Sequence, residues 1–264
     1  MKRDPFDLSG RHALVCGGSA GIGRAAALAL AERGARVTAL ARSRDALERL
    51  TGELRQAGAP EARYLAADHD DRPALEARVR DFLARHGPVH VLVNNSGGPP
   101  PGPILEASAE DFLHAFGRHL LASHLLVRLI LPGMVEDGYG RIINVISTSV
   151  REPLPGLGVS NAIRGAVASW AKTLARELPA AVTINNLLPG FTDTERLAAL
   201  AERLAAGRGT TPEQVRQEWI ASVPAGRIGR PEELGWVVAF LASPAASYVR
   251  GVSLPVDGGR LQSI

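Results

Sequence analysis

Short apolar runs alternate with longer amphipathic segments along the whole chain. The short runs predict strands, which we place at 12–16, 35–40, 62–66, 89–93, 141–146, 182–187 and 252–256. The longer segments have a helical period, and we place helices at 21–33, 45–57, 73–86, 110–134, 157–178, 193–206, 212–222 and 231–243. Regular alternation of this kind predicts an α/β fold, a doubly wound parallel sheet of about seven strands with helices on both faces.

The sequence GGPPPGP at 97–103 has the composition of a linker between domains. It is too short to separate two domains, and strand–helix alternation resumes directly after it. We therefore expect one domain over 1–264, with this segment forming a loop at the mouth of a site. We expect the segment 192–222 to cover that site, and its Ala, Leu and Arg content predicts an apolar pocket with a cationic rim.

The composition excludes several classes of protein. Apolar residues make up 45% of the 264 residues, enough for a full core, and a net charge of +3 is too small for a nucleic-acid-binding surface. The single cysteine, Cys16, cannot form an internal disulfide, and the sequence has no metal-type spacing of Cys and His. Without a run of about 18 apolar residues or a secretory signal, we expect a cytoplasmic protein with no membrane partner.

A glycine-rich turn follows the first predicted strand. It contains Gly17, Ser19, Gly21, Ile22 and Gly23, and the first predicted helix begins within it. Glycines there allow a tight turn and let backbone amides approach a pyrophosphate at the helix N-terminus. Such turns also occur as plain strand–helix connections. The strand before it, the helix after it and the absence of acidic residues from the turn favour a dinucleotide-binding Rossmann fold.

Arg42 and Ser43 follow the second predicted strand. A carboxylate at this place hydrogen-bonds the adenosine ribose of NAD, whereas an arginine accommodates the additional phosphate of NADP. No acid competes for the position, so the sequence favours NADP(H) as cofactor, with NAD(H) as the alternative. Arg42 could also be one more solvated arginine, because only Lys2 and Lys172 among the 30 basic residues are lysines.

The order of the motifs resembles the short-chain dehydrogenase/reductase family, and within it the 3-oxoacyl-acyl-carrier-protein reductases. The first turn is similar to the family's TGxxxGxG with Cys16 in place of threonine, and VDGG at 256–259 resembles its closing motif. NNSG at 94–97 is similar to NNAG, and PGFTDT at 189–194 is similar to PGxxxT. The resemblance implies cofactor-binding roles for these motifs and for the acid after the third strand, namely for Asp68, Asn94, Ser96, Gly97, Pro189, Gly190, Thr192 and Thr194.

The catalytic positions depart from that family. Its members have a tyrosine and, four residues later, a lysine at the start of the helix after the fifth strand, where this chain has Ser160 and Arg164. The family's serine, thirteen residues before the tyrosine, is matched by Ser147. The family's asparagine in the preceding long helix is replaced by His119. One of the four expected catalytic residues is therefore present.

The replacements change the acid–base chemistry. A serine hydroxyl is a much weaker acid than the phenol it replaces, and Arg164 offers a fixed charge and donors to the ribose without releasing a proton. An imidazole titrates near pH ~6.5, so we expect His119 to supply the proton. The alternative interpretation is a buried helix histidine hydrogen-bonded to backbone. Ser147 either orients a carbonyl or satisfies the end of a strand, and its position favours the first.

Two functions remain open. The first is an NADP(H)-dependent carbonyl or alcohol oxidoreductase acting on a small molecule. In it, Ser147 and Ser160 position the oxygen, while His119 donates the proton and Arg164 anchors the ribose. The second is a catalytically silent NADP(H)-binding scaffold or sensor, which the missing tyrosine supports. The resemblance also implies a homo-oligomer, a tetramer or dimer, because the family typically assembles through its two long helices and last strand.

Overall fold

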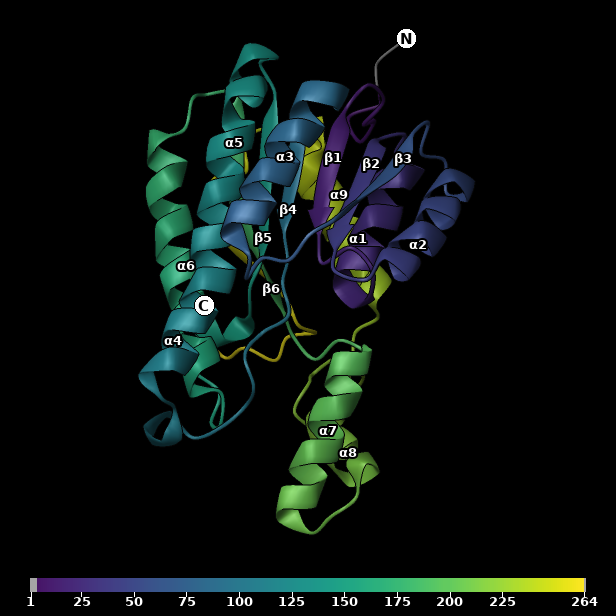
Figure 1. The fold of residues 1–264 in the computed structure, drawn as a ribbon. Helices are drawn as coiled ribbons and strands as arrows, with labels where there is room; N and C mark the ends of the chain where they lie inside the picture. The colour runs from purple at the N-terminus through teal and green to yellow at the C-terminus, as the bar shows by residue number, and fades with distance from the viewer. Residues whose placement is uncertain (1–3, 264) are drawn as a thin grey trace.

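Seven strands form one parallel sheet in the computed structural model, which describes residues 4–263. They are β1 (His12–Cys16), β2 (Arg36–Ala41), β3 (Ala62–Ala66), β4 (Val91–Asn94), β5 (Gly140–Val145), β6 (Val182–Pro189) and β7 (Ser253–Val256). Their order is β3-β2-β1-β4-β5-β6-β7, and every neighbouring pair is parallel (Figure 1). The chain winds outward in one direction from β1 and in the other from β4, which confirms the predicted doubly wound fold.

Helices cover both faces of the sheet, as predicted (Figure 1). They are α1 (Gly21–Glu32), α2 (Arg44–Gln56), α3 (Arg72–His86), α4 (Ala109–Phe116), α5 (Ala122–Glu136), α6 (Gly158–Glu177), α7 (Glu195–Arg208), α8 (Pro212–Ala221) and α9 (Pro231–Ala242). One hydrophobic core joins α1, α2 and α9 to one face, and a second joins α3, α5 and α6 to the other.

The strands are apolar at successive positions because both of their faces are buried. In β1, Ala13 and Val15 belong to the core with α1, α2 and α9, whereas Leu14 and Cys16 belong to the core with α3, α5 and α6. Successive side chains of a strand point to opposite faces, so a strand covered on both sides has no polar face to show. This explains why the strands occur in the sequence as short continuous apolar runs.

A π-helical turn interrupts the helix predicted over 110–134. α4 passes into η2 (Gly117–Leu121), whose hydrogen bonds have π spacing, and α5 continues to Glu136. The apolar pattern runs through the turn without a break, so the sequence does not reveal it. Single π turns are frequent at functional sites, and this one carries His119.

The continuous helix Ala109–Glu136 is long and apolar enough to suit a membrane span, a property that core helices share. In the structure α5 packs against α3 and β5. Its Leu126, Ile130 and Met134 are fully buried in the core on that face. The helix is therefore part of the layer that covers the sheet.

α7 and α8 form a hairpin that projects from the carboxyl edge of the sheet (Figure 1). The hairpin has a small core of its own, made by Ala201, Ala205 and Val215. Trp219 of α8 stacks on Phe191, with ring centroids 5.0 Å apart. This stack joins the hairpin to the chain that leaves β6, so the segment expected to cover the site is attached at that edge.

α1 and α9 cross closely on one face of the sheet. A Cβ on Gly235 of α9 would lie only 2.6 Å from the carbonyl oxygen of Ala25 in α1. The two backbones approach this closely because glycine has no side chain at the crossing. Since α1 begins in the glycine-rich turn at Gly21, the crossing also fixes the position of that turn.

Gly235→Ala should lower the free energy of unfolding by about 1–3 kcal/mol, because the added methyl group has to displace the backbone of α1. Gly207→Ala in α7 is the matched control. Nothing lies within 4 Å of its Cβ position, so this variant should gain about 0.5–1 kcal/mol. Urea unfolding of both variants measures the difference, and equal stabilities would contradict the close crossing.

Candidate active site

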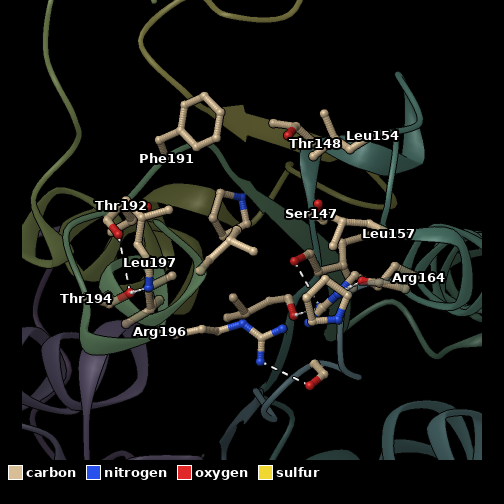
Figure 2. A pocket seen from close by; sticks show the side chains of 18 of the residues that line it. Ser147, Thr148, Leu154, Leu157, Arg164, Phe191, Thr192, Thr194, Arg196 and Leu197 are labelled. Carbon is tan, nitrogen blue, oxygen red and sulfur yellow. Dashed lines mark hydrogen bonds between the residues drawn. The ribbon is translucent and has the colours of Figure 1, made fainter. Parts of the chain in front are cut away.

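A cavity of about 530 Å³ opens at the carboxyl edge of the sheet. Asn95, Val145 and Pro189, at or directly after the ends of β4, β5 and β6, line it together with the start of α6 and one side of α7 (Figure 2). The proline-rich loop contributes Pro99 and Pro101. Open α/β sheets bind their ligands at this edge, so the cavity is the candidate active site.

Ser147, Ser160 and Arg164, three of the residues predicted to be catalytic, line this cavity. Ser147 precedes the short 3-10 helix η3 (Thr148–Val150), and its Oγ accepts a hydrogen bond of 3.0 Å from the backbone N–H of Ser149. Ser160 lies one turn before Arg164 in α6, and Arg164 Nε donates to Ser160 Oγ at 3.3 Å. Both serine oxygens accept from the protein, which leaves their hydroxyl protons free for a ligand oxygen.

Arg164 is a buried cation with no carboxylate partner among residues 4–263. Its Nη1 donates to the carbonyl oxygens of Val145 at 3.1 Å and Ile146 at 2.9 Å, at the end of β5. Burial, and then the neighbouring charge of Arg196, lower the pKa of Arg164 to about 10. The guanidinium therefore stays charged at pH 7, and the backbone holds this charge beside Ser160.

His119 lies beside the main cavity and does not line it. It lies in a second, much smaller pocket together with Ser96 and Arg164. Nδ1 and Ser96 Oγ share a hydrogen bond of 2.7 Å, while Nε2 is buried without a partner among the described residues. Burial, followed by the charges of nearby arginines, lowers the pKa of His119 to about 2. A neutral imidazole outside the cavity does not fit the acid role predicted from the sequence.

Asn94 also lies away from the main cavity, in a ladder of buried amides across the sheet. Asn94 Nδ2 donates to Asn144 Oδ1 at 2.9 Å, and Asn144 Nδ2 donates to Asn186 Oδ1 at 2.9 Å. Asn186 Nδ2 then donates to Ser253 Oγ at 3.1 Å. The parallel register of β4 to β7 aligns these residues. Asn95, the next residue along the chain, lines the cavity in place of Asn94.

The glycine-rich turn has the geometry of an anion site. α1 begins at Gly21, and neither a side-chain cap from Ala20 nor an acidic residue in the first turn satisfies its free N–H groups. Gly17 and Gly21 have φ values of +57° and +51°, which favour glycine. A Cβ on Gly23 would collide with the carbonyl oxygen of Gly17. The turn requires its glycines, and its free donors fit a dinucleotide pyrophosphate.

Other residues predicted to bind the cofactor surround these two features. Ile22 and Ser96 line the main cavity. Ser19 lies in the glycine-rich turn three residues before Ile22, and Gly97 lies between Ser96 and Gly98 in the loop after β4. Neither Ser19 nor Gly97 lines the cavity.

Arg42 and Asp68 meet at the ends of β2 and β3. Arg42 Nη1 lies 4.0 Å from Asp68 Oδ2, and the arginine side chain is 73% exposed, so this ion pair is weak. Arg42 is therefore accessible to a phosphate. Ser43 instead caps α2, because its Oγ accepts a hydrogen bond of 3.4 Å from the backbone N–H of Ala46. These residues lie outside the main cavity, as the adenosine end of an extended dinucleotide requires.

The chain that leaves β6 holds the last group of predicted residues. Pro189, Gly190, Thr192 and Thr194 all line the main cavity. Thr194 caps α7 by accepting a hydrogen bond of 3.3 Å from the backbone N–H of Leu197, and its hydroxyl donates to the Thr192 carbonyl at 3.3 Å. Thr192 donates in turn to the Gly190 carbonyl at 3.2 Å. These bonds fix the segment between β6 and α7.

Arg196 lines the cavity and was not among the residues predicted from the sequence. This side chain extends from α7 toward Arg164 (Figure 2), and it donates to the carbonyl oxygens of Gly98 at 3.1 Å and Pro99 at 3.5 Å. It therefore ties α7 to the proline-rich loop across the cavity. In a chain this rich in arginine, its position two residues after Thr194 is the one signal that could have singled it out.

The parallel sheet, the glycine-rich turn after β1 and the cavity at the carboxyl edge define a dinucleotide-binding oxidoreductase. A family model described as enoyl-(acyl carrier protein) reductase matches residues 17–260. The chain belongs to the short-chain dehydrogenase/reductase family and is an oxidoreductase of that family.

Individual relatives match along nearly the full chain. The 3-oxoacyl-[acyl-carrier-protein] reductase of Vibrio cholerae is 34% identical over 257 residues, which are 96% of this chain and 98% of that protein. The 2,3-dihydroxy-2,3-dihydro-p-cumate dehydrogenase of Pseudomonas putida is 33% identical, covering 98% and 97%. The structure of L-sorbose reductase from Gluconobacter frateurii, complexed with NADPH and L-sorbose, matches with a TM-score of 0.92 and 29% identity, covering 99% of this chain and all of that chain.

His119→Asn should flatten the acid side of the stability profile. As the pH falls below ~6.5, the unfolded chain protonates this histidine and the folded chain, with a pKa of about 2, does not. The wild type therefore loses up to about 1.4 kcal/mol of stability per pH unit from this group. Between pH ~6.5 and ~5, the variant should lose about 2 kcal/mol less than the wild type in urea unfolding.

His124→Asn, which alters an exposed histidine of α5, is the control for loss of a histidine at the surface. A His119→Asn profile parallel to that of the wild type would show that the buried imidazole is protonated in the folded state, contrary to the account above.

Proposed function

We propose that the protein is an NADP(H)-dependent oxidoreductase that interconverts a carbonyl and an alcohol group on a small molecule of the 3-oxoacyl type. The observation that carries this proposal is that Ser147, Ser160 and Arg164 line one cavity, which Ile22 of the glycine-rich turn also lines. The L-sorbose reductase structure, which contains NADPH and L-sorbose, supports the cofactor and the class of reaction.

The residues present fit the cofactor. The free N–H groups at the start of α1 would hold the pyrophosphate, and Arg42 would hold the phosphate on the adenosine ribose. Arg164 would donate to the hydroxyls of the nicotinamide ribose, with Pro189 and Thr192 beside the nicotinamide. When bound, the cofactor supplies the hydride that reduces the carbonyl carbon.

Ser147, Ser160 and Arg164 act on the carbonyl oxygen. Each serine oxygen already accepts a hydrogen bond from the protein, so each hydroxyl proton is available to that oxygen. As negative charge develops there, the buried guanidinium of Arg164 stabilises it. These donors are held in place before the reaction and do not reorganise during it.

The proton that completes the alcohol comes from the hydroxyl of Ser160. A serine is a weak acid, but an alkoxide is a correspondingly strong base, and the charge of Arg164 beside Ser160 favours loss of its proton. Water entering the open cavity then gives a proton to the Ser160 oxygen, and the hydroxide that remains leaves to the solvent. Arg164 remains charged throughout, because its pKa of about 10 lies well above neutral pH.

His119 is a positioning residue in this proposal. Its hydrogen bond with Ser96 orients a residue that lines the cavity. Because its ring is neutral, it adds no second titrating charge beside Arg164. It contacts neither substrate nor cofactor, so its effect is on the placement of the loop after β4.

A catalytically silent NADP(H)-binding scaffold or sensor is the second candidate. It is favoured by one observation: no described residue that lines the main cavity is an Asp, Glu, His, Cys, Lys or Tyr. An ordinary acid–base catalyst that titrates near neutral pH is therefore missing from the lining.

We further propose a homo-oligomer in the cytoplasm. The long helix that the family uses for assembly exposes Leu113, Leu121 and Val135, which a neighbouring subunit would cover.

Arg42→Ala should weaken NADPH binding by about tenfold to a hundredfold, because it removes charge-assisted hydrogen bonds to the ribose phosphate. The affinity for NADH, which lacks that phosphate, should stay unchanged. Fluorescence titration measures both, and Arg85→Ala in the last turn of α3 is the control, with no effect on either cofactor. An equal loss for NADPH and NADH would contradict the role of Arg42.

Ser160→Ala should lower kcat/KM for ketone reduction about 10²-fold, the usual cost of one donor to a developing oxyanion. The Kd for NADPH should change little. A panel of ketones and 3-oxoacyl thioesters assayed with NADPH measures the rates, and Ser169→Ala on the exposed side of α6 is the matched control.

The double variant Ser160→Tyr, Arg164→Lys separates the two candidate functions. If the native arrangement is a working enzyme, this variant loses activity. If the wild type is a silent scaffold, the wild type shows no turnover and the double variant gains it. Cofactor binding without turnover on any substrate of the panel would overturn the enzymatic proposal.

A further inference from the structure

All of the formal charge lining the main cavity is positive. Among residues 4–263, no Asp or Glu lines it, and five arginines do: Arg118, Arg164, Arg196, Arg203 and Arg260. A lining with charge of one sign and apolar walls concentrates the opposite charge in the cleft. A substrate can pair only with those arginines that the protein has not already engaged.

Arg118, Arg164 and Arg196 are already engaged. Arg118 pairs with Asp70, with Nε 2.9 Å from Oδ1, so its charge is neutralised within the protein. Arg164 is held by carbonyl oxygens at the end of β5, and Arg196 by carbonyl oxygens of the proline-rich loop. Arg203 and Arg260 form no ion pair among the described residues, and they are the two free cations of the lining.

Arg260 is held on the substrate side of the cavity. Its guanidinium carbon lies 4.9 Å from the centre of the Phe191 ring, and its Nη1 donates to Thr148 Oγ1 at 3.4 Å. Thr148 follows Ser147, which is placed to bind the carbonyl oxygen. Phe191 is itself stacked on Trp219, so an aromatic pair supports the guanidinium plane. Four of the five N–H donors of Arg260 remain for a ligand.

The charge of Glu152 interacts with Arg260 from outside the lining. The Glu152 carboxylate is occupied by the backbone N–H groups of Gln262 and Ser263, each donating at 2.8 Å. Glu152 does not line the cavity, so among residues 4–263 no carboxylate of the lining itself pairs with Arg260.

The remaining walls near Arg260 are apolar. Figure 2 shows Leu154 and Leu157 on one side of the cavity, with Phe191 and Leu197 on the other. A ligand that matches this lining has a short apolar body and one anionic end. A planar guanidinium fork pairs best with a planar carboxylate.

We propose that the substrate is an oxo acid whose carbonyl oxygen binds Ser147 and Ser160 and whose carboxylate binds Arg260. This assignment rests on the proposed function, because it takes the serines as the carbonyl site. Arg203 lines the same cavity from α7 and adds to its positive potential.

Isothermal titration calorimetry on the NADP⁺-saturated protein tests the assignment without requiring turnover. The probes are acetoacetate and 4-oxopentanoate, each compared with its uncharged methyl ester. The acids should bind at least about tenfold more tightly than the esters, because a charge-assisted pair is lost in the ester, and the gap should narrow as salt is added. Equal affinity of acids and esters would overturn the proposal.

Variants assign the effect to one side chain. Arg260→Gln should bring the affinity for the acids down to that of the esters, and Arg260→Lys should retain part of the preference, since it keeps the charge and loses the fork. Arg208→Gln is the matched control, because Arg208 lies on α7, pairs with Glu218 and does not line the cavity. A preference for acids that survives Arg260→Gln would assign the anion site elsewhere and contradict the proposal.

Two further arms separate the possible failures. Dihydroxyacetone phosphate tests the anion class, and tight binding of this phosphate with no binding of the carboxylates would overturn the oxo-acid assignment. The Kd for NADPH, measured on Arg260→Gln, should be unchanged, and a weakened Kd would show that Arg260 serves the cofactor. Oxo acids that bind but are not reduced by NADPH would contradict the proposed enzymatic function and would still support the anion site.

Discussion

Arg164 donates to the carbonyl oxygens of Val145 and Ile146 and to the hydroxyl oxygen of Ser160, and its side chain is buried at the wall of the cavity. A buried guanidinium without a carboxylate partner is costly, and the backbone carbonyls at the end of β5 offset only part of that cost. The rest of the site is arranged around this charge. The neighbouring histidine is kept neutral, no acid among residues 4–263 lines the cavity, and the serine oxygens accept from the protein, which leaves their protons for a ligand.

The chemistry that follows differs in kind from proton transfer by a tuned phenol. A tyrosine beside a lysine gives an acid whose pKa is adjusted to the reaction. Here Arg164 contributes charge that does not titrate near neutral pH, and Ser160 contributes a hydroxyl whose acidity depends on that charge. In the proposed mechanism the positive potential of the cavity serves two purposes, because it would stabilise a developing alkoxide and attract an anionic substrate.

Much of the fold was predictable because local pattern and global packing agree. The strands are buried on both faces, so their short apolar runs are visible in the sequence, and the turn with Gly17 and Gly21 is constrained by positive φ values. The π turn that carries His119 was not predictable, because the apolar period continues through it. The pKa of His119 is lowered by burial and by the charges of arginines that are distant in sequence, and no local sequence pattern reveals these contacts.

The site was predictable in part through the resemblance to the family. That resemblance implied site positions for Ser147, Ser160 and Arg164, and all three line one cavity, although Ser160 and Arg164 come from α6 and Ser147 from the end of β5. The sequence indicated Asn94 for the cofactor site, whereas the structure places Asn94 in the amide ladder and Asn95 in the cavity lining, which no local pattern reveals. In a chain rich in arginine, residue type alone could not distinguish free cations from paired ones.

The most direct test of a site that works through fixed charge is the pH dependence of hydride transfer, measured in a single turnover with saturating NADPH and a ketone that the protein reduces. The rate should be level between about pH 5 and 9, because His119 titrates near 2 and Arg164 near 10 and no other titratable side chain of the described residues lines the cavity beyond its arginines. An inflection near pH ~6.5 that disappears in His119→Asn would contradict the account, since it would make the imidazole the proton donor.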